Sequence, residues 1–343
     1  MSINRNSLTL DVVVLSHNRP KLLKRAMLAI DNVDFGISVN KIVSDNSSNH
    51  SEVRGVIEND WIIKERNSRI SWIQHFILNL NECKSDWILI TNDDDEILEE
   101  FGRWFSFNID NTSINVITGG TNTVNGQGVF VKNEGYTNRF TKSKISAKEI
   151  YSSEEFLRMI MRFGSLFPFS GIALKAEIIE TLNLASPEKY GFAFDYFFAL
   201  ELCVSGKNKN SLIAYKSNES IINYFIHGEQ LSSEHSMRYR LLGESLLCRL
   251  NVVSREKYDF SNAEFLVLFA QILISRSVAS SGNQTDLLDL IDDMFKNSFN
   301  KCLKFKLLKI ANKFPVILAH FFYELYTIYD KVFWKFRSKF RSK

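Results

Sequence analysis

An apolar strand pattern that runs into three consecutive aspartates constrains this chain more than any other feature. Residues 87–90 read Trp-Ile-Leu-Ile, and Asp93, Asp94 and Asp95 follow after two polar residues. An apolar run of this length suits a buried strand that is covered on both faces. Three adjacent carboxylates repel one another, so solvent or a bound cation must offset their charge. The pattern indicates either a ligand site at the end of a strand or a solvated acidic loop that caps the next helix.

Two earlier segments also combine an apolar run with a polar turn. Residues 8–15 precede the turn 16–19, and residues 41–44 precede the turn 45–48. Helical spacing of apolar residues separates the three strands, and Asn18 is the expected cap of the first helix. This β-α-β-α-β order predicts an α/β fold with a doubly wound, mostly parallel sheet. The three polar turns then lie along one edge of the sheet and form a ligand cleft.

The second half of the chain continues the α/β pattern and then changes to helix. We expect a strand over 114–118, a polar glycine-rich loop over 119–148, a capping box at Ser152 and Glu155, a helix over 194–204 that Gly206 stops, and strands over 212–215 and 221–226. From about residue 235 onward the pattern is helical. We therefore predict one domain over 1–235 and a helical extension over 236–343.

Composition limits the partners and the location of the protein. The 343 residues carry a formal net charge of +3, too small to give the basic field of a nucleic-acid-binding protein. The four cysteines lie far apart without metal-ligand spacing, which favours free thiols in a reducing cytoplasm. Residues 1–7 are polar and no apolar run reaches the length of a membrane span, so we expect a cytoplasmic protein.

Aromatic and basic residues alternate over 314–340. A helix of this composition is typical of attachment to an anionic membrane surface, here the inner face of the plasma membrane. The alternative is a helix that packs on the main domain with a solvated basic end. The sequence leaves both interpretations open.

Several common functional motifs are absent from the sequence: a phosphate-binding loop, a dinucleotide-binding turn, a nucleophile elbow and a zinc-ligand spacing. The remaining candidates are the acidic residues of the cleft and a later acid, Asp195. Each has a structural alternative when it is taken alone. Asp45 suits a turn cap, Asp195 a helix N-cap, and His227 a structural histidine near a strand end.

Six motifs in this order resemble family 2 glycosyltransferases of the GT-A fold. They are the strand and turn 14–19, the strand end 43–48, Asn67 with Arg69, the acidic motif 92–95, the segment 194–198 followed by Gly206-Lys207, and the segment 227–232 that begins with His227. The resemblance covers about residues 8 to 235. His75 departs from the family, since many members carry an asparagine there.

The resemblance assigns roles to specific residues. It implies that Asp195 is the general base. It places six residues at the nucleotide: Ser16, His17, Arg19, Asp45, Arg69 and Asp93. It also implies that Asp94, Asp95 and His227 hold Mn²⁺ or Mg²⁺. Two alignments of the acidic motif are possible, so which two aspartates act on the metal stays open, and Asp94 is a ligand in both.

The function implied is an inverting, metal-dependent glycosyl transfer. The donor is expected to be a UDP- or dTDP-sugar, and the acceptor a hydroxyl of a lipid-linked glycan in surface polysaccharide synthesis, such as O-antigen or capsule. A sugar-nucleotide nucleotidyltransferase is one alternative, although its glycine-rich loop is missing. A non-catalytic module that binds nucleotide sugars is the other.

Overall fold

The computed structural model places part of the 343-residue chain, and the fold is described for that part. The described residues are 5–58, 60–66, 70–125, 129, 149–163, 169–184, 187–226, 244–252, 255, 265, 268–269 and 271–272. They belong to two compact units. Unit 1 comprises Met1–Glu188 and Glu201–Gln230, and unit 2 comprises Lys189–Leu200 and Leu231–Lys343. The expected domain boundary at residue 235 falls outside the described residues and stays a prediction.

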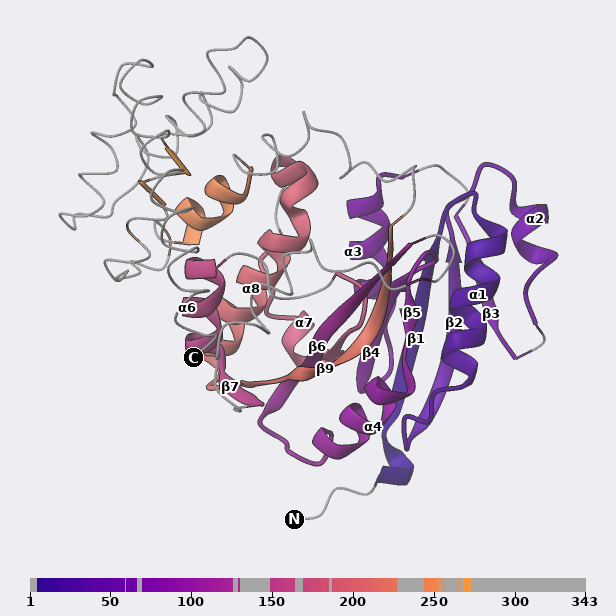
Figure 1. Ribbon diagram of the computed structural model, residues 1–343, viewed down its shortest axis with the longest axis horizontal. Coiled ribbons are helices and arrows are strands. Elements are labelled where there is room, and N and C mark those ends of the chain that lie inside the picture. Colours follow the sequence, from indigo (N-terminus) through magenta and orange to yellow (C-terminus); the bar gives the residue numbers. More distant parts are fainter. Residues whose placement is uncertain are drawn as a thin grey trace, which may run out of the picture. The chain divides into compact units, whose positions relative to one another are not determined.

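Strands and helices alternate along most of unit 1 (Figure 1). The strands are β1 (Thr9–Ser16), β2 (Ser38–Asp45), β3 (Ile62–Glu65), β4 (Trp87–Asn92), β5 (Glu96–Ile97), β6 (Ile114–Asn125), β7 (Ile150–Ser152), β8 (Ile172–Lys175) and β9 (Leu212–Ile226). The α-helices are α1 (Pro20–Asp31), α2 (His50–Arg54), α3 (Trp72–Glu82), α4 (Glu99–Asn108), α6 (Ser153–Phe163), α7 (Ala176–Ile179) and α8 (Phe194–Asn208). Two 3-10 helices are also described, η1 (Arg5–Ser7) and η2 (Pro187–Ala193), and residues 244–252 are helical as well.

The strands form one sheet in the order β3-β2-β1-β4-β8-β6-β9-β5, and β7 pairs with β9. β1 lies between β2 and β4 and is parallel to both. In this register Ser16 lies beside Asp45, and Leu15 lies beside Asn92. The predicted parallel α/β sheet is therefore confirmed, and the three strands end at one edge. β3 is parallel to β2 and extends the sheet by a strand that the sequence patterns did not predict.

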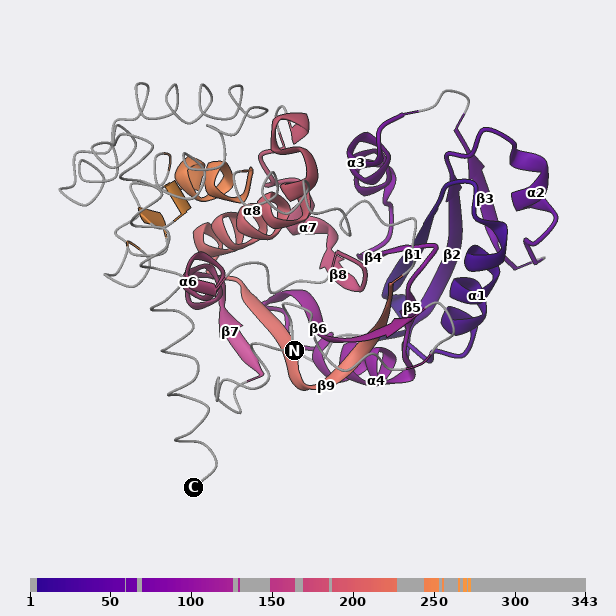
Figure 2. The ribbon, with the colours of Figure 1, turned by 45° about the horizontal axis from the view of Figure 1, so that its top comes forward.

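The sheet is covered on both faces, which explains the nearly continuous apolar runs of β1 and β4. Leu10, Val12 and Val14 of β1 pack in the same core cluster as Leu23 and Met27 of α1. The intervening side chains point to the opposite face, because successive strand residues alternate. α3 covers that second face, so the sheet lies between α1 and α3 (Figure 2). Helices on both faces leave the strand ends as the accessible edge.

The predicted ends of one strand and one helix were wrong, and so was the predicted start of the loop 119–148, most of which lies outside the described residues. Gly119 to Asn125 continue β6, although a loop was expected from residue 119. Gly119 is needed there because a Cβ atom would come within 2.8 Å of the Lys216 carbonyl oxygen on β9. α8 continues past Gly206 to Asn208, and the glycine instead allows a close approach to Ser153, whose Oγ would lie 2.2 Å from a Cβ atom.

Two further details differ from the predictions. The two strands expected over 212–226 form the single strand β9, because β6 supplies a partner along most of its length. Asn18 does not cap α1: it has a φ angle of 56°, and Arg19 occupies the N-cap position without a side-chain cap. The capping box of Ser152 and Glu155 is confirmed, with Glu155 N donating to Ser152 Oγ at 3.2 Å and Ser152 N donating to Glu155 Oε2 at 2.9 Å.

Within the described residues, no helix combines the length and the apolar character needed to cross a bilayer. The aromatic and basic segment 314–340 lies outside the described residues. Cys83, Cys203 and Cys248 are free thiols, as expected, and Cys302 is not described.

Candidate functional site

The turns that follow β1, β2 and β4 are joined by backbone hydrogen bonds at the carboxyl edge of the sheet. Asn46 N donates to the Ser16 carbonyl at 3.0 Å, and Asp93 N donates to the Leu15 carbonyl at 3.0 Å. Ser16 itself is only 1% exposed. The predicted convergence of the three polar turns is therefore present in unit 1.

Arg19 offsets the charge of the aspartate cluster. Its Nη1 donates to Asp94 Oδ2 at 2.6 Å, and its Nη2 lies 2.7 Å from Asp93 Oδ1. Arg25 adds a second guanidinium, which donates to the Asp94 carbonyl at 2.9 Å and lies 3.1 Å from Glu96. The sequence suggested solvent or a cation as the counter-charge. In the structure, two arginines of α1 and its N-cap supply positive charge at this position.

Asp93 is held inside the protein. It is fully buried, and its Oδ2 accepts a hydrogen bond from His17 N at 3.0 Å. Burial raises the pKa of Asp93 to about 7, while the charge of Arg19 lowers it. Asp93 therefore ties the β1 turn to the β4 tip.

Asp95 connects the opposite half of the sheet to the cluster. It is 1% exposed, accepts a hydrogen bond from the Ser170 hydroxyl, and accepts another from Phe225 N at 3.3 Å. Burial and the neighbouring charge of Asp94 raise the pKa of Asp95. Ser170 was not predicted as part of the site, and no local sequence signal marks it.

The contacts of Asp93, Asp94 and Asp95 show whether these side chains are available to bind a divalent cation. Carboxylate oxygens are the right ligand type for Mn²⁺ or Mg²⁺. However, Asp93 and Asp95 are buried and bonded to protein donors, and Asp94, 8% exposed, is held by Arg19. His227 falls outside the described residues, and within the described part no three His, Cys, Asp or Glu side chains are grouped as metal ligands. As placed, the described residues do not form a cation site.

Asp45, at the tip of β2, is buried beneath two partners. Its Oδ1 accepts a hydrogen bond from Ser47 N at 3.0 Å, and its Oδ2 lies 2.6 Å from His50 Nδ1. The Asp45 side chain has no exposed surface, whereas 24% of the His50 side chain is exposed. His50 was not singled out from the sequence, although it lies only five residues after Asp45.

Residues 66 and 70 are fixed to the tip of β2, while the predicted nucleotide contact Arg69 lies between them, outside the described residues. Arg66 N donates to the Asp45 carbonyl at 2.9 Å. Asn46 donates from Nδ2 to the Ile70 carbonyl at 2.8 Å and accepts from Ile70 N at 3.2 Å. The backbone on both sides of residues 67–69 is thus anchored at the carboxyl edge of the sheet.

His75 belongs to a buried network under this edge. Ser44 Oγ accepts hydrogen bonds from Asn79 Nδ2 and Arg66 Nε, each at 3.0 Å. Its own hydrogen is then available for His75 Nε2, 2.7 Å away, so His75 is a neutral acceptor. Burial lowers the pKa of His75 to about 4.

Asp195 lies in the part of α8 that belongs to unit 2. It is partly exposed, and its Oδ1 accepts a hydrogen bond from Tyr196 N at 2.7 Å. Although part of the residue is exposed, burial of its carboxyl group raises the pKa of Asp195 to about 6. In the same unit, Glu244 accepts a hydrogen bond from Ala193 N at 3.2 Å and so fixes the chain two residues earlier.

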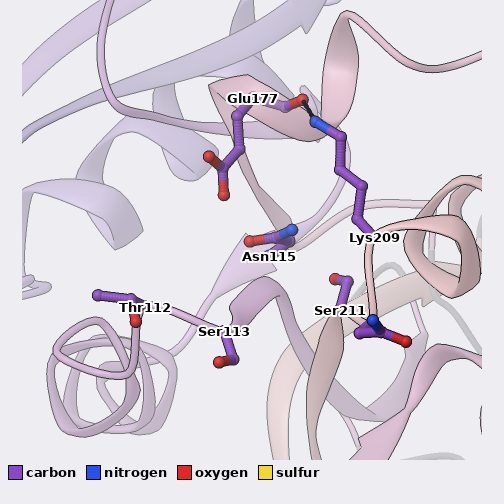
Figure 3. Close-up of a pocket in the computed structure, with 7 residues that line it drawn as sticks. Thr112, Ser113, Asn115, Glu177, Lys209 and Ser211 are labelled. Carbon is purple, nitrogen blue, oxygen red and sulfur yellow. Dashed lines mark hydrogen bonds between the residues drawn. The ribbon is translucent and has the colours of Figure 1, made fainter.

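A polar pocket lies at the other edge of the unit 1 sheet. It has a volume of about 380 Å³ and is lined by Asn115 of β6, by Glu177 of α7, and by the residues that directly precede β6 and β9 (Figure 3). Lys209 donates to the Glu177 carbonyl across it at 2.9 Å. β8 lies between β4 and β6 and is antiparallel to both, so β4 and β6 run in the same direction. The pocket lies at the start of β6 and the aspartate cluster at the end of β4, so the two are at opposite edges of the sheet.

Solved structures share this architecture. TarS of S. aureus aligns with a TM-score of 0.56 and 15% identity, over 88% of this chain and 50% of TarS. TarS 1–349 in complex with UDP-GlcNAc aligns with a TM-score of 0.53 and 15% identity, over 84% and 81%. GalNAc-T7 with UDP, GalNAc and Mn²⁺ aligns with a TM-score of 0.50 and 12% identity, over 91% and 59%.

The chain spans half the length of the TarS structure that it matches first. No protein-family model and no curated protein matches the sequence. At this identity the structural matches show the fold alone, which is a GT-A-like α/β fold.

Proposed function

We propose that this chain is an inverting glycosyltransferase that uses a nucleotide-diphosphate sugar. The observation that carries the proposal is the joining of the β1, β2 and β4 tips, where Arg19 faces Asp93 and Asp94. In parallel α/β sheets, this edge is where ligands bind. The GT-A-like fold supports the assignment, since the TarS structure that shares it contains UDP-GlcNAc.

The donor is proposed to bind along this edge as a UDP- or dTDP-sugar. Ser16, His17 and Asp45 would lie on the base side, with Asp45 buried beneath its partners, and Arg69 and Asp93 would complete the nucleotide site. Arg19 has the clearest chemical role, because a guanidinium binds phosphate oxygens through paired, charge-assisted hydrogen bonds. A bound diphosphate would compete with Asp94 for these donors.

A divalent cation, Mn²⁺ or Mg²⁺, is also part of the proposal, with Asp94, Asp95 and His227 as its expected ligands. The GalNAc-T7 structure, which shares the fold, contains Mn²⁺. An ion held by these residues would neutralise charge on the leaving diphosphate. Because Arg19 holds Asp94 in the described arrangement, binding of the cation requires Arg19 to release that carboxylate.

Asp195 is proposed as the general base. A carboxylate with a pKa of about 6 is largely ionised at neutral pH yet can accept a proton. The acceptor oxygen forms a bond to the anomeric carbon, the bond to the diphosphate oxygen breaks, and the hydroxyl proton passes to Asp195. A single displacement of this kind inverts the anomeric configuration.

The acceptor and location extend the proposal further. We expect a hydroxyl of a lipid-linked glycan, in synthesis of a surface polysaccharide such as O-antigen or capsule. The enzyme would then work in the cytoplasm, with the segment 314–340 in contact with the membrane surface.

A turnover assay tests the function. The full chain is incubated with UDP- and dTDP-sugars, a glycan acceptor and Mn²⁺, and release of the nucleoside diphosphate is measured. The proposal expects acceptor-dependent release, lost in Asp195→Asn. Tight donor binding without turnover would identify a non-catalytic module, and release of pyrophosphate from a sugar phosphate and nucleoside triphosphate would identify a nucleotidyltransferase.

A further inference from the structure

We infer that His50, oriented by Asp45, is the side chain that reads the nucleotide base and selects uracil or thymine over cytosine. This inference rests on the proposed function, since it concerns the base of the same donor. It assigns the buried Asp45 an indirect role, and it makes His50 the group that touches the ligand.

Asp45 and His50 differ in how far their side chains are exposed to a ligand. Asp45 has no exposed side-chain surface, and its two oxygens are occupied by Ser47 N at 3.0 Å and His50 Nδ1 at 2.6 Å. A base therefore cannot reach the carboxylate in this arrangement. The His50 side chain lies over it and is 24% exposed.

The Asp45 carboxylate also fixes the tautomer of the His50 ring. An ionised carboxylate only accepts hydrogen bonds, so His50 Nδ1 must carry the hydrogen in this contact. In a neutral imidazole the other nitrogen, Nε2, then has a lone pair. Among the described residues, no hydrogen-bond partner is recorded for His50 Nε2. His50 thus presents an acceptor.

Both ring nitrogens of His17, the other histidine at this edge, already have hydrogen-bond partners. His17 Nδ1 donates to the Asn46 carbonyl at 2.8 Å, and its Nε2 accepts from Asn18 Nδ2 at 3.2 Å. Of the two rings, His50 therefore has the ring nitrogen that is open to a ligand within the described part of the chain.

The backbone before His50 is fixed beside the β1 turn. Asn18 N donates to Ser47 Oγ at 2.7 Å, and Asn18 Oδ1 accepts from Ser48 N at 3.0 Å. The nearby charges of Arg54 and Glu65 pair with each other. These contacts hold the ring at the same edge as the aspartate cluster.

An acceptor at this position discriminates between pyrimidines. Ring nitrogen N3 carries a hydrogen in uracil and thymine, and this hydrogen can be donated to His50 Nε2. Cytosine has a lone pair at N3, which would face the lone pair of His50. A site that pairs one donor with one acceptor rejects a ligand that leaves both groups unsatisfied.

Calorimetric titration of the full chain with UDP and CDP at pH 8 tests the inference. The two ligands have the same phosphates and nearly the same size. We expect UDP to bind at least about tenfold more tightly than CDP. The N3 hydrogen of uracil can bond to His50 Nε2, whereas the N3 lone pair of cytosine would face the lone pair of that nitrogen. His50→Ala should weaken UDP binding about tenfold and reduce the preference. Glu52→Gln, on the exposed side of the same short helix, is the matched control and should change neither affinity.

Asp45→Asn gives a sharper test. Its Oδ1 would still accept from Ser47 N, so the amide nitrogen would face His50 and donate to Nδ1. His50 would then carry its hydrogen on Nε2, and the preference should move toward CDP. A role limited to packing would not reverse a preference.

The results distinguish failure of the inference about His50 from failure of the proposed glycosyltransferase function. Normal UDP binding with an unchanged UDP-to-CDP ratio in His50→Ala overturns the inference about His50 and leaves the proposed function standing. Failure of the wild-type chain to bind UDP or dTDP overturns the proposed function and this inference with it. Circular dichroism checks the fold of each variant, and the His50→Ala result decides the question should Asp45→Asn fail to fold.

Discussion

Arg19 donates a hydrogen bond to the Asp94 carboxylate at 2.6 Å, across 75 residues of sequence. The same guanidinium lies 2.7 Å from the fully buried Asp93, so one positive charge is shared between two acids at the strand tip. A positive charge is therefore built into the place where the leaving diphosphate of a sugar donor is proposed to lie.

Replacing Arg19 with alanine should destabilise unit 1 and make the cluster more responsive to metal. Loss of a counter-charge beside a buried carboxylate is expected to cost about 1–3 kcal/mol. Mn²⁺ should then raise the melting temperature more in Arg19→Ala than in the wild type, because Asp94 is released. Differential scanning fluorimetry with and without Mn²⁺ measures both effects.

Arg103→Ala provides the control for this prediction. Arg103 pairs with Glu99 and Glu100 on α4, and 65% of its side chain is exposed. Its loss should change stability by less than about 0.5 kcal/mol, with no change in the response to Mn²⁺. An equal Mn²⁺ shift in wild type and Arg19→Ala would argue against a metal role for these aspartates.

Asp195→Asn should retain donor binding and lose transfer by about a hundredfold or more. Burial raises the pKa of Asp195 to about 6, and only the ionised form can accept a proton. The wild-type kcat should therefore fall as the pH drops through about 6, and this limb should be absent in the residual activity of the variant. A pH–rate profile checks both, and near-normal kcat in the variant would exclude the role.

The parallel half of the sheet could be predicted because its signals are local. Apolar runs, helical spacing and polar turns are each contained in a few consecutive residues, and they located β1, β2 and β4 and their shared edge. The acidic residues at the β4 tip were also identified correctly as lying at that edge.

The partners of those acids could not be predicted, because they depend on contacts between distant segments. Ser170, which donates to Asp95, and Arg19, which donates to Asp94, are each 75 residues from their partners. The continuity of β9 likewise depends on pairing with β6. Composition alone also could not show that Asp45 is covered by His50, since an aspartate in a polar turn is ordinarily solvated.

His75 should make the stability of the protein depend on pH. Its folded-state pKa is lowered to about 4, against about 6.5 in an unfolded chain. As the pH falls from about 6.5 to about 4, the unfolded state gains a proton that the folded state does not bind, so up to about 3 kcal/mol of stability is lost. Urea unfolding at several pH values measures this. His75→Asn, although less stable, should show a smaller decline, and an equal decline in both proteins would refute the assignment.

Truncation before Phe333 should weaken membrane association without removing activity on a soluble acceptor analogue. Basic residues near an anionic surface contribute about 1 kcal/mol each, so binding should also weaken at high salt. Co-sedimentation with anionic liposomes compares the two forms. Equal binding of the full and truncated chains at low salt would favour the alternative of a helix packed on the protein.

Asn46→Ala should lower the affinity for UDP several-fold by freeing the segment that carries Arg69. The Asn46 amide makes two hydrogen bonds with the backbone of Ile70, at 2.8 and 3.2 Å, and their loss leaves both backbone groups without these partners. Asn40→Ala is the matched control: Asn40 lies on β2, the strand that Asn46 directly follows, and donates to Asp11 and Ser85 at 2.9 and 3.3 Å, far from the β2 tip. Both variants should lose about 1–3 kcal/mol of stability. Only Asn46→Ala should weaken UDP binding in calorimetry, so an equal loss of affinity in the two variants would show that the segment after Arg66 has no particular role in holding the nucleotide.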